Sequence, residues 1–121
     1  MRRKKAQSEP TPAPRKIALR VIYLRETDYW VAQCLEHDIA AQGKTLSEVE
    51  DAFRKTLVGQ IVLDLRKGRE PLEDIKPAPS IYWRKFREGL RLGVEPNIEL
   101  PSEIPPAFMI EGITSETRIL G

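Results

Sequence analysis

Apolar and polar residues alternate in the first part of the chain that has a clear pattern. Residues 17–24 place one set of mainly apolar side chains on each face of an extended strand, and residues 29–36 return with aromatic and β-branched residues after a short polar run. Residues 39–43 form a shorter candidate strand that ends at Gly43, where glycine permits a turn. The pattern predicts a three-stranded antiparallel meander.

The hydrophobic period then changes from two residues to that of a helix. Thr45 and Glu48 form a T-x-x-E capping box, in which both side chains satisfy backbone donors at a helix start. Gly68 and Pro71 are typical of residues just beyond a helix end, so we place the end near Lys67. The apolar stripe of this amphipathic helix consists of Leu46, Val49, Ala52, Phe53, Leu57, Ile61 and Leu65.

One face of the second predicted strand is suited to receive this helix. Trp30, Ala32 and Cys34 share that face, and the small Ala32 and Cys34 permit close approach. Phe53 lies in the middle of the helical stripe, so we expect its ring to pack against Ala32 and Cys34.

Signals for secondary structure are weaker after the helix. A second, shorter helix is predicted from Ile81 to about Leu92. Residues 93–107 carry four prolines and are expected to be an extended connector, while residues 108–113 and 117–120 have a strand-like pattern.

The predicted fold class is therefore α+β, with a three-stranded meander packed on one amphipathic helix, a short second helix and an extended C-terminal tail. The N-terminal arm has consecutive basic residues at positions 2–5 and three prolines, a composition that predicts disorder. The expected organisation is a basic arm at residues 1–15, a β-β-β-α domain at 16–76, the short helix at 77–92, and a proline-rich connector with possible terminal strands at 93–121.

Composition limits the functional classes. The 20 basic and 18 acidic side chains give a net charge of +2, a balance that does not by itself indicate nucleic-acid binding. Cys34 is the single cysteine, so an internal disulfide is excluded. Apolar runs are too short for a membrane helix or a secretory signal, which predicts a cytoplasmic protein. Because one small core gives only marginal stability, we expect a homo-oligomer.

The segment from residue 29 to 57, YWVAQCLEHDIAAQGKTLSEVEDAFRKTL, resembles the HicB-like antitoxin family. The closest match is the turn and helix start at residues 42–48, and the similarity covers about residues 17–67. The resemblance implies a truncated ribonuclease-H-like fold, often completed by a further strand from beyond the helix. It also implies a role in a toxin-antitoxin system, in which the antitoxin binds and neutralises a small HicA-type toxin that cleaves messenger RNA.

The chain departs from the family pattern after Gly68. Many such antitoxins add a helix-turn-helix or ribbon-helix-helix that represses their own operon, whereas this sequence has one plausible helix there. Other HicB-like proteins are solitary domains without a toxin neighbour or an assigned role. The sequence of residues 34–39 is similar to that of these solitary domains. Antitoxin and solitary domain of unknown role both remain open.

The residues with catalytic potential do not form a complete site in the sequence. Glu36, His37 and Asp38 contain the chain's one histidine between two carboxylates, but a metal site would need further ligands. A ribonuclease-H-like nuclease would need carboxylates on the first strand, and residues 17–24 have none. Cys34 lies in mid-strand without a basic neighbour, as a core residue does. We therefore predict no catalytic residue, no metal, no cofactor and no enzymatic activity.

Basic residues on the second predicted helix offer a different function. Arg84, Arg87 and Arg91 line one face, beside aromatic residues that could stack on bases. Two interpretations follow from different classes of protein. The chain is either a binding module whose sheet edge or helix face recognises a small HicA-like toxin, which we favour, or a nucleic-acid-binding regulator that uses these arginines and the basic arm. In the favoured interpretation the aromatic residues pack on the sheet or on a second subunit and the arginines are solvated.

Overall fold

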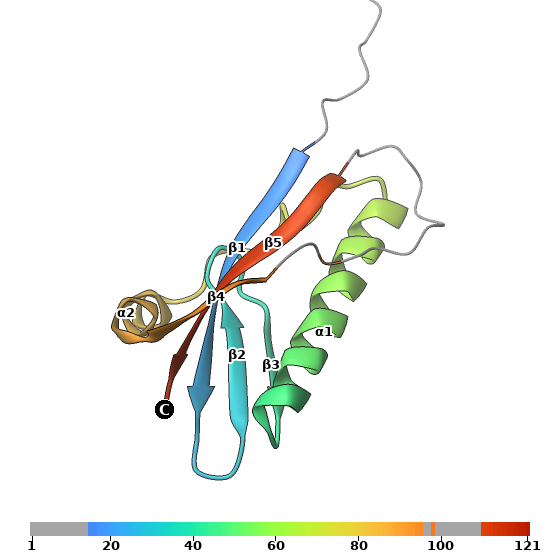
Figure 1. Ribbon diagram of the computed structural model, residues 1–121. Coiled ribbons are helices and arrows are strands. Elements are labelled where there is room, and N and C mark those ends of the chain that lie inside the picture. Colours follow the sequence, from blue (N-terminus) through green and yellow to red (C-terminus); the bar gives the residue numbers. More distant parts are fainter. Residues whose placement is uncertain (1–14, 96–97, 99–109) are drawn as a thin grey trace, which may run out of the picture.

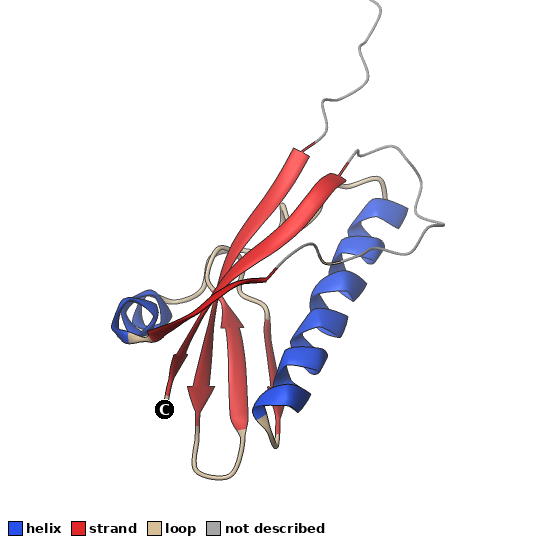
Figure 2. Ribbon diagram, in the orientation of Figure 1, coloured by secondary structure: helices blue, strands red, loops and turns tan. Residues whose placement is uncertain are grey.

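The computed structural model describes residues 15–95, 98 and 110–121. They form a mixed sheet with a helix on each of its two faces (Figures 1 and 2). The elements in chain order are β1 (Arg15–Arg25), β2 (Trp30–Cys34), β3 (Ala40–Gly43), α1 (Leu46–Arg66), α2 (Ser80–Glu88), β4 (Leu90–Glu95) and β5 (Ile110–Leu120).

The strands lie in the order β3-β2-β1-β5-β4, which places β1 at the centre of the sheet. The β1 to β3 strands form the predicted antiparallel meander, with Val21 opposite Cys34 and Tyr23 opposite Ala32. On its other side β1 pairs in parallel with β5, and β4 closes that edge antiparallel to β5. Strand β1 has a neighbouring strand at each edge and a helix over each face, which explains why it carries apolar side chains on both faces.

The start and end of α1 agree with the sequence signals. Thr45 Oγ1 accepts a 3.1 Å hydrogen bond from the Glu48 backbone N–H, and the Glu48 carboxylate accepts one of 3.0 Å from the N–H of Lys44. Gly68, two residues beyond the helix, has a φ of 71°, a conformation that favours glycine. The capping box and the glycine stop are confirmed.

The larger core lies between the sheet and α1. Phe53 is buried in the same cluster as Ala32 and Cys34, as predicted. Gly43 ends β3 where α1 passes closely, since a Cβ atom there would lie 2.7 Å from the backbone nitrogen of Val49. The buried members of this core are Leu19, Val21, Tyr23, Ala32, Cys34, Ile39, Val49, Phe53, Leu57, Ile61, Leu65, Leu72, Ile98 and Ile113.

A smaller core lies between α2 and the opposite face of the sheet. Phe86 is buried there together with Leu35 and with Ile22 and Leu24 of β1. The aromatic residues of α2 therefore pack on the sheet, which is one of the two packings that the favoured interpretation allowed.

The C-terminal part differs from the sequence prediction, which was incomplete in giving the sheet three strands. The helix predicted over 81–92 ends at Glu88, because Gly89 adopts extended backbone with φ −77° and ψ 157°. Leu90 then pairs with Ile119, so the expected last turn of the helix and the start of the connector are strand β4. From residue 110 onward, the two strand-like stretches predicted near the C-terminus belong to one strand, β5, and residues 108–109 lie outside the described residues.

The basic arm expected over residues 1–15 lies outside the described residues except for Arg15, which begins β1. Positions 96–97 and 99–109, which include most of the predicted connector, also lie outside them.

Candidate functional site

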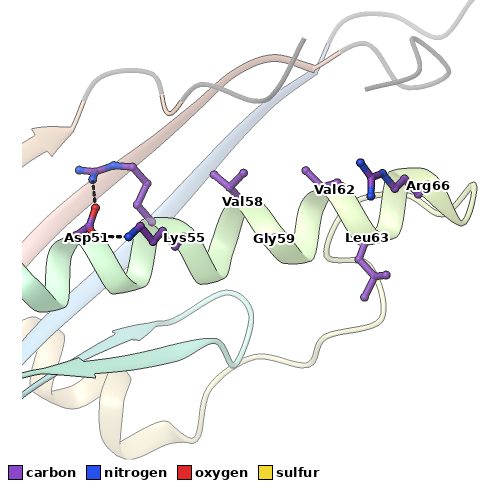
Figure 3. Close-up of a pocket in the computed structure, with 8 residues that line it drawn as sticks. Asp51, Lys55, Val58, Gly59, Val62, Leu63 and Arg66 are labelled. Atoms are coloured by element: carbon purple, nitrogen blue, oxygen red, sulfur yellow. Dashed lines mark ion pairs between the residues drawn. The ribbon is translucent and has the colours of Figure 1, made fainter. Parts of the chain in front are cut away.

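An apolar groove with a volume of about 680 Å³ runs along α1, beside the face that packs on the sheet. Its apolar lining consists of Val58, Gly59, Val62 and Leu63 (Figure 3). Val58 and Val62 point the same way and are half-buried, whereas Leu63 projects from another side of the helix and is 44% exposed. Gly59 leaves open space between them, since a Cβ atom there would contact nothing within 4 Å. We call this surface the α1 groove.

Charged side chains border the α1 groove at both ends. Asp51 forms ion pairs with Lys55 at 3.0 Å and with Arg54 at 3.7 Å near its N-terminal end, and Arg66 lies at the other end (Figure 3). Among the described residues, the border has three basic side chains and one acidic side chain. An apolar centre with a charged border is typical of a protein-binding surface.

Sequence reasoning did not single out the α1 groove. A signal was present, because Val58, Val62 and Leu63 are apolar residues outside the predicted helical stripe. Val58 packs against the larger core from the edge of this stripe, and Val62 and the exposed Leu63 extend the apolar surface away from it, which indicates a second contact surface.

The arginines predicted as a nucleic-acid site come from two elements instead of one helix. Arg84 and Arg87 are exposed on α2, and Arg91 lies in β4 with a side chain that is 70% exposed. Glu116 of β5 links Arg91 to Arg118, since its Oε2 lies 3.5 Å from Nη2 of each.

Arg118 is a basic residue that the sequence analysis did not include. Its Nη1 donates to the backbone carbonyl of Phe86 at 3.1 Å and to that of Arg87 at 3.5 Å. Its guanidinium also lies over the Phe86 ring, 4.5 Å from the ring centre. These contacts hold the C-terminal end of α2 against β5.

The aromatic side chains of α2 face inward. Phe86 is buried, and Trp83 packs against the smaller core with its Nε1–H donating to the carbonyl of Ala78 at 3.1 Å. The guanidinium of Arg20 covers the Trp83 ring at 4.7 Å. These two rings are therefore engaged and do not form a platform for bases.

The side chains of Glu36, His37 and Asp38 have structural partners. The Glu36 carboxylate accepts hydrogen bonds from the backbone N–H of Arg20 at 2.8 Å and from its Nε at 2.6 Å. His37 Nδ1 lies 3.0 Å from a backbone carbonyl oxygen in the loop before α2, and Asp38 accepts from the Gln33 side chain at 2.8 Å. Across residues 15–95, 98 and 110–121, no three His, Cys, Asp or Glu side chains are grouped so as to hold a metal ion.

Cys34 is a free cysteine that is buried in the core between the sheet and α1. Burial raises the pKa of the Cys34 thiol from its ordinary value of 9.0 to about 11. The thiol is therefore protonated at neutral pH, as expected of a core residue.

Comparisons with known proteins give no assignment: no family model matches the chain, and neither a curated protein nor a solved structure matches it significantly. In the part of the chain that the structure describes, neither helix is long and apolar enough to span a membrane.

Proposed function

We propose that the chain is a protein-binding module of the HicB-like antitoxin type, which binds and neutralises a small HicA-type toxin through the α1 groove. The observation that carries this proposal is the apolar surface of Val58, Gly59, Val62 and Leu63, which begins beside the sheet-packed face of α1 and extends away from it. The capped helix on which the family resemblance rests is the same element.

The border of the α1 groove restricts the chemistry of the partner. Lys55 and Arg66 are exposed at this border, so a complementary surface has apolar side chains at its centre and carboxylates at its edge. A toxin that binds here must therefore present carboxylates around an apolar patch to α1.

Leu63 is the residue of choice for disrupting this contact without unfolding the domain. Its side chain is 44% exposed, so Leu63→Asp leaves the core intact but brings an unpaired carboxylate into the proposed interface. We expect the affinity for the toxin to fall at least about tenfold, which corresponds to about 1.4 kcal/mol. Leu92→Asp is the matched control, because Leu92 has a similar exposure of 46% and lies in β4, away from α1.

The experiment starts with purification of the tagged chain from its native host and identification of co-purifying proteins by mass spectrometry. A captured small protein is then purified and tested for cleavage of messenger RNA, with parent, Leu63→Asp or Leu92→Asp chain added. The proposal expects cleavage to be inhibited by the parent and Leu92→Asp and much less by Leu63→Asp. Absence of an RNA-cleaving partner, or cleavage that the parent does not inhibit, overturns it. Equal inhibition by all three chains overturns the assignment to the α1 groove.

A further inference from the structure

The side of the molecule opposite α1 carries a cluster of arginines that the proposed toxin binding does not use. Arg84, Arg87, Arg91 and Arg118 come from α2, β4 and β5, and we call this cluster the basic surface. Figure 1 shows α2 and α1 on opposite sides of the sheet, so the basic surface and the α1 groove are separate.

A chain of contacts brings members of the basic surface together. Glu116 lies between Arg91 and Arg118 at 3.5 Å from each, and Arg118 in turn donates to the carbonyl of Arg87 at 3.5 Å. Arg84 precedes Arg87 by three residues on α2, which places the two on neighbouring positions of the helix surface. Residues distant in the sequence thus form one patch.

The basic surface keeps an excess of positive charge. Among the described residues, its four arginines lie beside Glu116 and the exposed Glu88 at the end of α2, and Glu36, which lines a pocket with Glu116, is bonded to Arg20. Arg118 is engaged with backbone carbonyls and Glu116, whereas the side chain of Arg91 is 70% exposed although one of its nitrogens contacts Glu116. Arg84, Arg87 and Arg91 are therefore exposed to solvent on α2 and β4. Guanidinium groups bind phosphate oxygens in a bidentate manner.

We propose that the basic surface binds the phosphodiester backbone of a double-stranded nucleic acid. Because Trp83 and Phe86 are packed on the sheet, the surface does not stack on bases, and binding is expected to be independent of sequence. DNA and RNA duplexes share the phosphate backbone. The test therefore uses both, to determine which of the two duplexes the basic surface binds.

The test measures the affinity of the full chain for labelled DNA and RNA duplexes by fluorescence anisotropy. The duplexes have about one and a half to two helical turns, and the measurement is repeated over a series of salt concentrations. On the duplex that the chain binds, the logarithm of the affinity should fall linearly with the logarithm of salt concentration. Each phosphate contact that is removed should reduce the slope by about 0.9 on B-form DNA. The double variant Arg84→Ala, Arg87→Ala should therefore lower the slope by about 1 to 2.

The control is the double variant Lys44→Ala, Lys67→Ala, which removes the same charge from exposed positions at the two ends of α1. Circular dichroism verifies that every variant is folded. The proposal is supported if the slope of log affinity against log salt concentration is reduced in the α2 variant and unchanged in the control. Tighter binding of one duplex identifies it as the ligand. Absence of binding, binding that the α2 variant leaves unchanged, or equal loss in both variants overturns it.

Discussion

The buried carboxylate of Asp64 accepts a 2.8 Å hydrogen bond from the backbone N–H of Leu72, across the loop that follows α1. Leu72 is buried and has a φ of 67°, a conformation that is unusual for a residue with a side chain. Asp64 also accepts from Gln60 at 3.1 Å and lies 3.7 Å from Arg69. The carboxylate therefore holds the loop in a conformation that Leu72 would not adopt by itself.

Asp64→Ala should lower the free energy of unfolding by about 1.5 to 3 kcal/mol, because it removes a charge-assisted hydrogen bond and leaves a buried N–H without its partner. Urea denaturation monitored by circular dichroism measures the change. The matched control is Asp74→Ala, which removes an exposed carboxylate that pairs with the same Arg69. It should stay within about 0.5 kcal/mol of the parent, and a similar loss in both variants would contradict the role assigned to Asp64.

Phe53→Ala should remove about 3 to 5 kcal/mol of stability, since it leaves a cavity between α1 and β2 where Ala32 and Cys34 are too small to fill it. Small domains have roughly 5 to 15 kcal/mol in total, so the variant should be largely unfolded or melt far below the parent. Lys55→Ala, whose side chain is 77% exposed, should change stability by less than about 0.5 kcal/mol. Thermal melting of the two variants decides whether α1 packs as described.

The Cys34 thiol should make stability decrease in alkaline solution. The thiol has a pKa of about 11 in the folded chain and an ordinary value of 9.0 when exposed, so the unfolded state loses its proton first. Its contribution is fully present below about pH 9 and is lost as pH rises through about 11, a change of order 1 to 3 kcal/mol.

Cys34→Ala isolates this effect, because lysine and tyrosine side chains titrate in the same range in both proteins. The difference in unfolding free energy between parent and variant should shrink between about pH 9 and 11. A difference that is constant over this range would mean that the thiol is not buried. At pH 8 the folded parent should also react with Ellman's reagent only after denaturant is added.

Two glycine substitutions should have opposite effects. Gly43→Ala places a Cβ atom 2.7 Å from the Val49 backbone nitrogen, where α1 must move away from β3, and should cost more than about 1 kcal/mol. Gly59→Ala places its methyl group in open space within a helix and should stabilise the chain by about 0.5 to 1 kcal/mol. Calorimetric melting temperatures of both variants give the signs, and a stabilised Gly43→Ala would refute the close approach.

The meander and α1 could be predicted because their signals are local. Alternation in β1 and the Thr45–Glu48 capping box each arise within a few residues of sequence. Strand β5 was harder to predict because its inward-facing positions include Ser115 and Thr117, which are polar although buried. Its alternation of apolar and polar residues is therefore weak, and its pairing with β1 depends on contacts remote in the sequence.

The candidate surfaces were also difficult to predict where they depend on contacts between residues remote in the sequence. The sequence indicated that Arg84 and Arg87 share a helix, and the structure has them on α2. Arg91 was assigned to that helix because the effect of Gly89 was not recognised, and the participation of Arg118 depends on the pairing of β5. Surfaces that are assembled from several elements require knowledge of the sheet order, which periodicity does not provide.

The parallel pairing of β1 with β5 has a consequence for how the protein is made. The central strand of the sheet receives one neighbour, β2, soon after its own synthesis, but its other neighbour is translated last among the described elements. Until β5 emerges from the ribosome, the open edge of β1 is a template for pairing with other nascent chains. Closure of so long a loop also slows folding. The protein should therefore fold after translation of β5 and not stepwise during it, and ribosome-stalled chains that end before residue 110 should be sensitive to proteases.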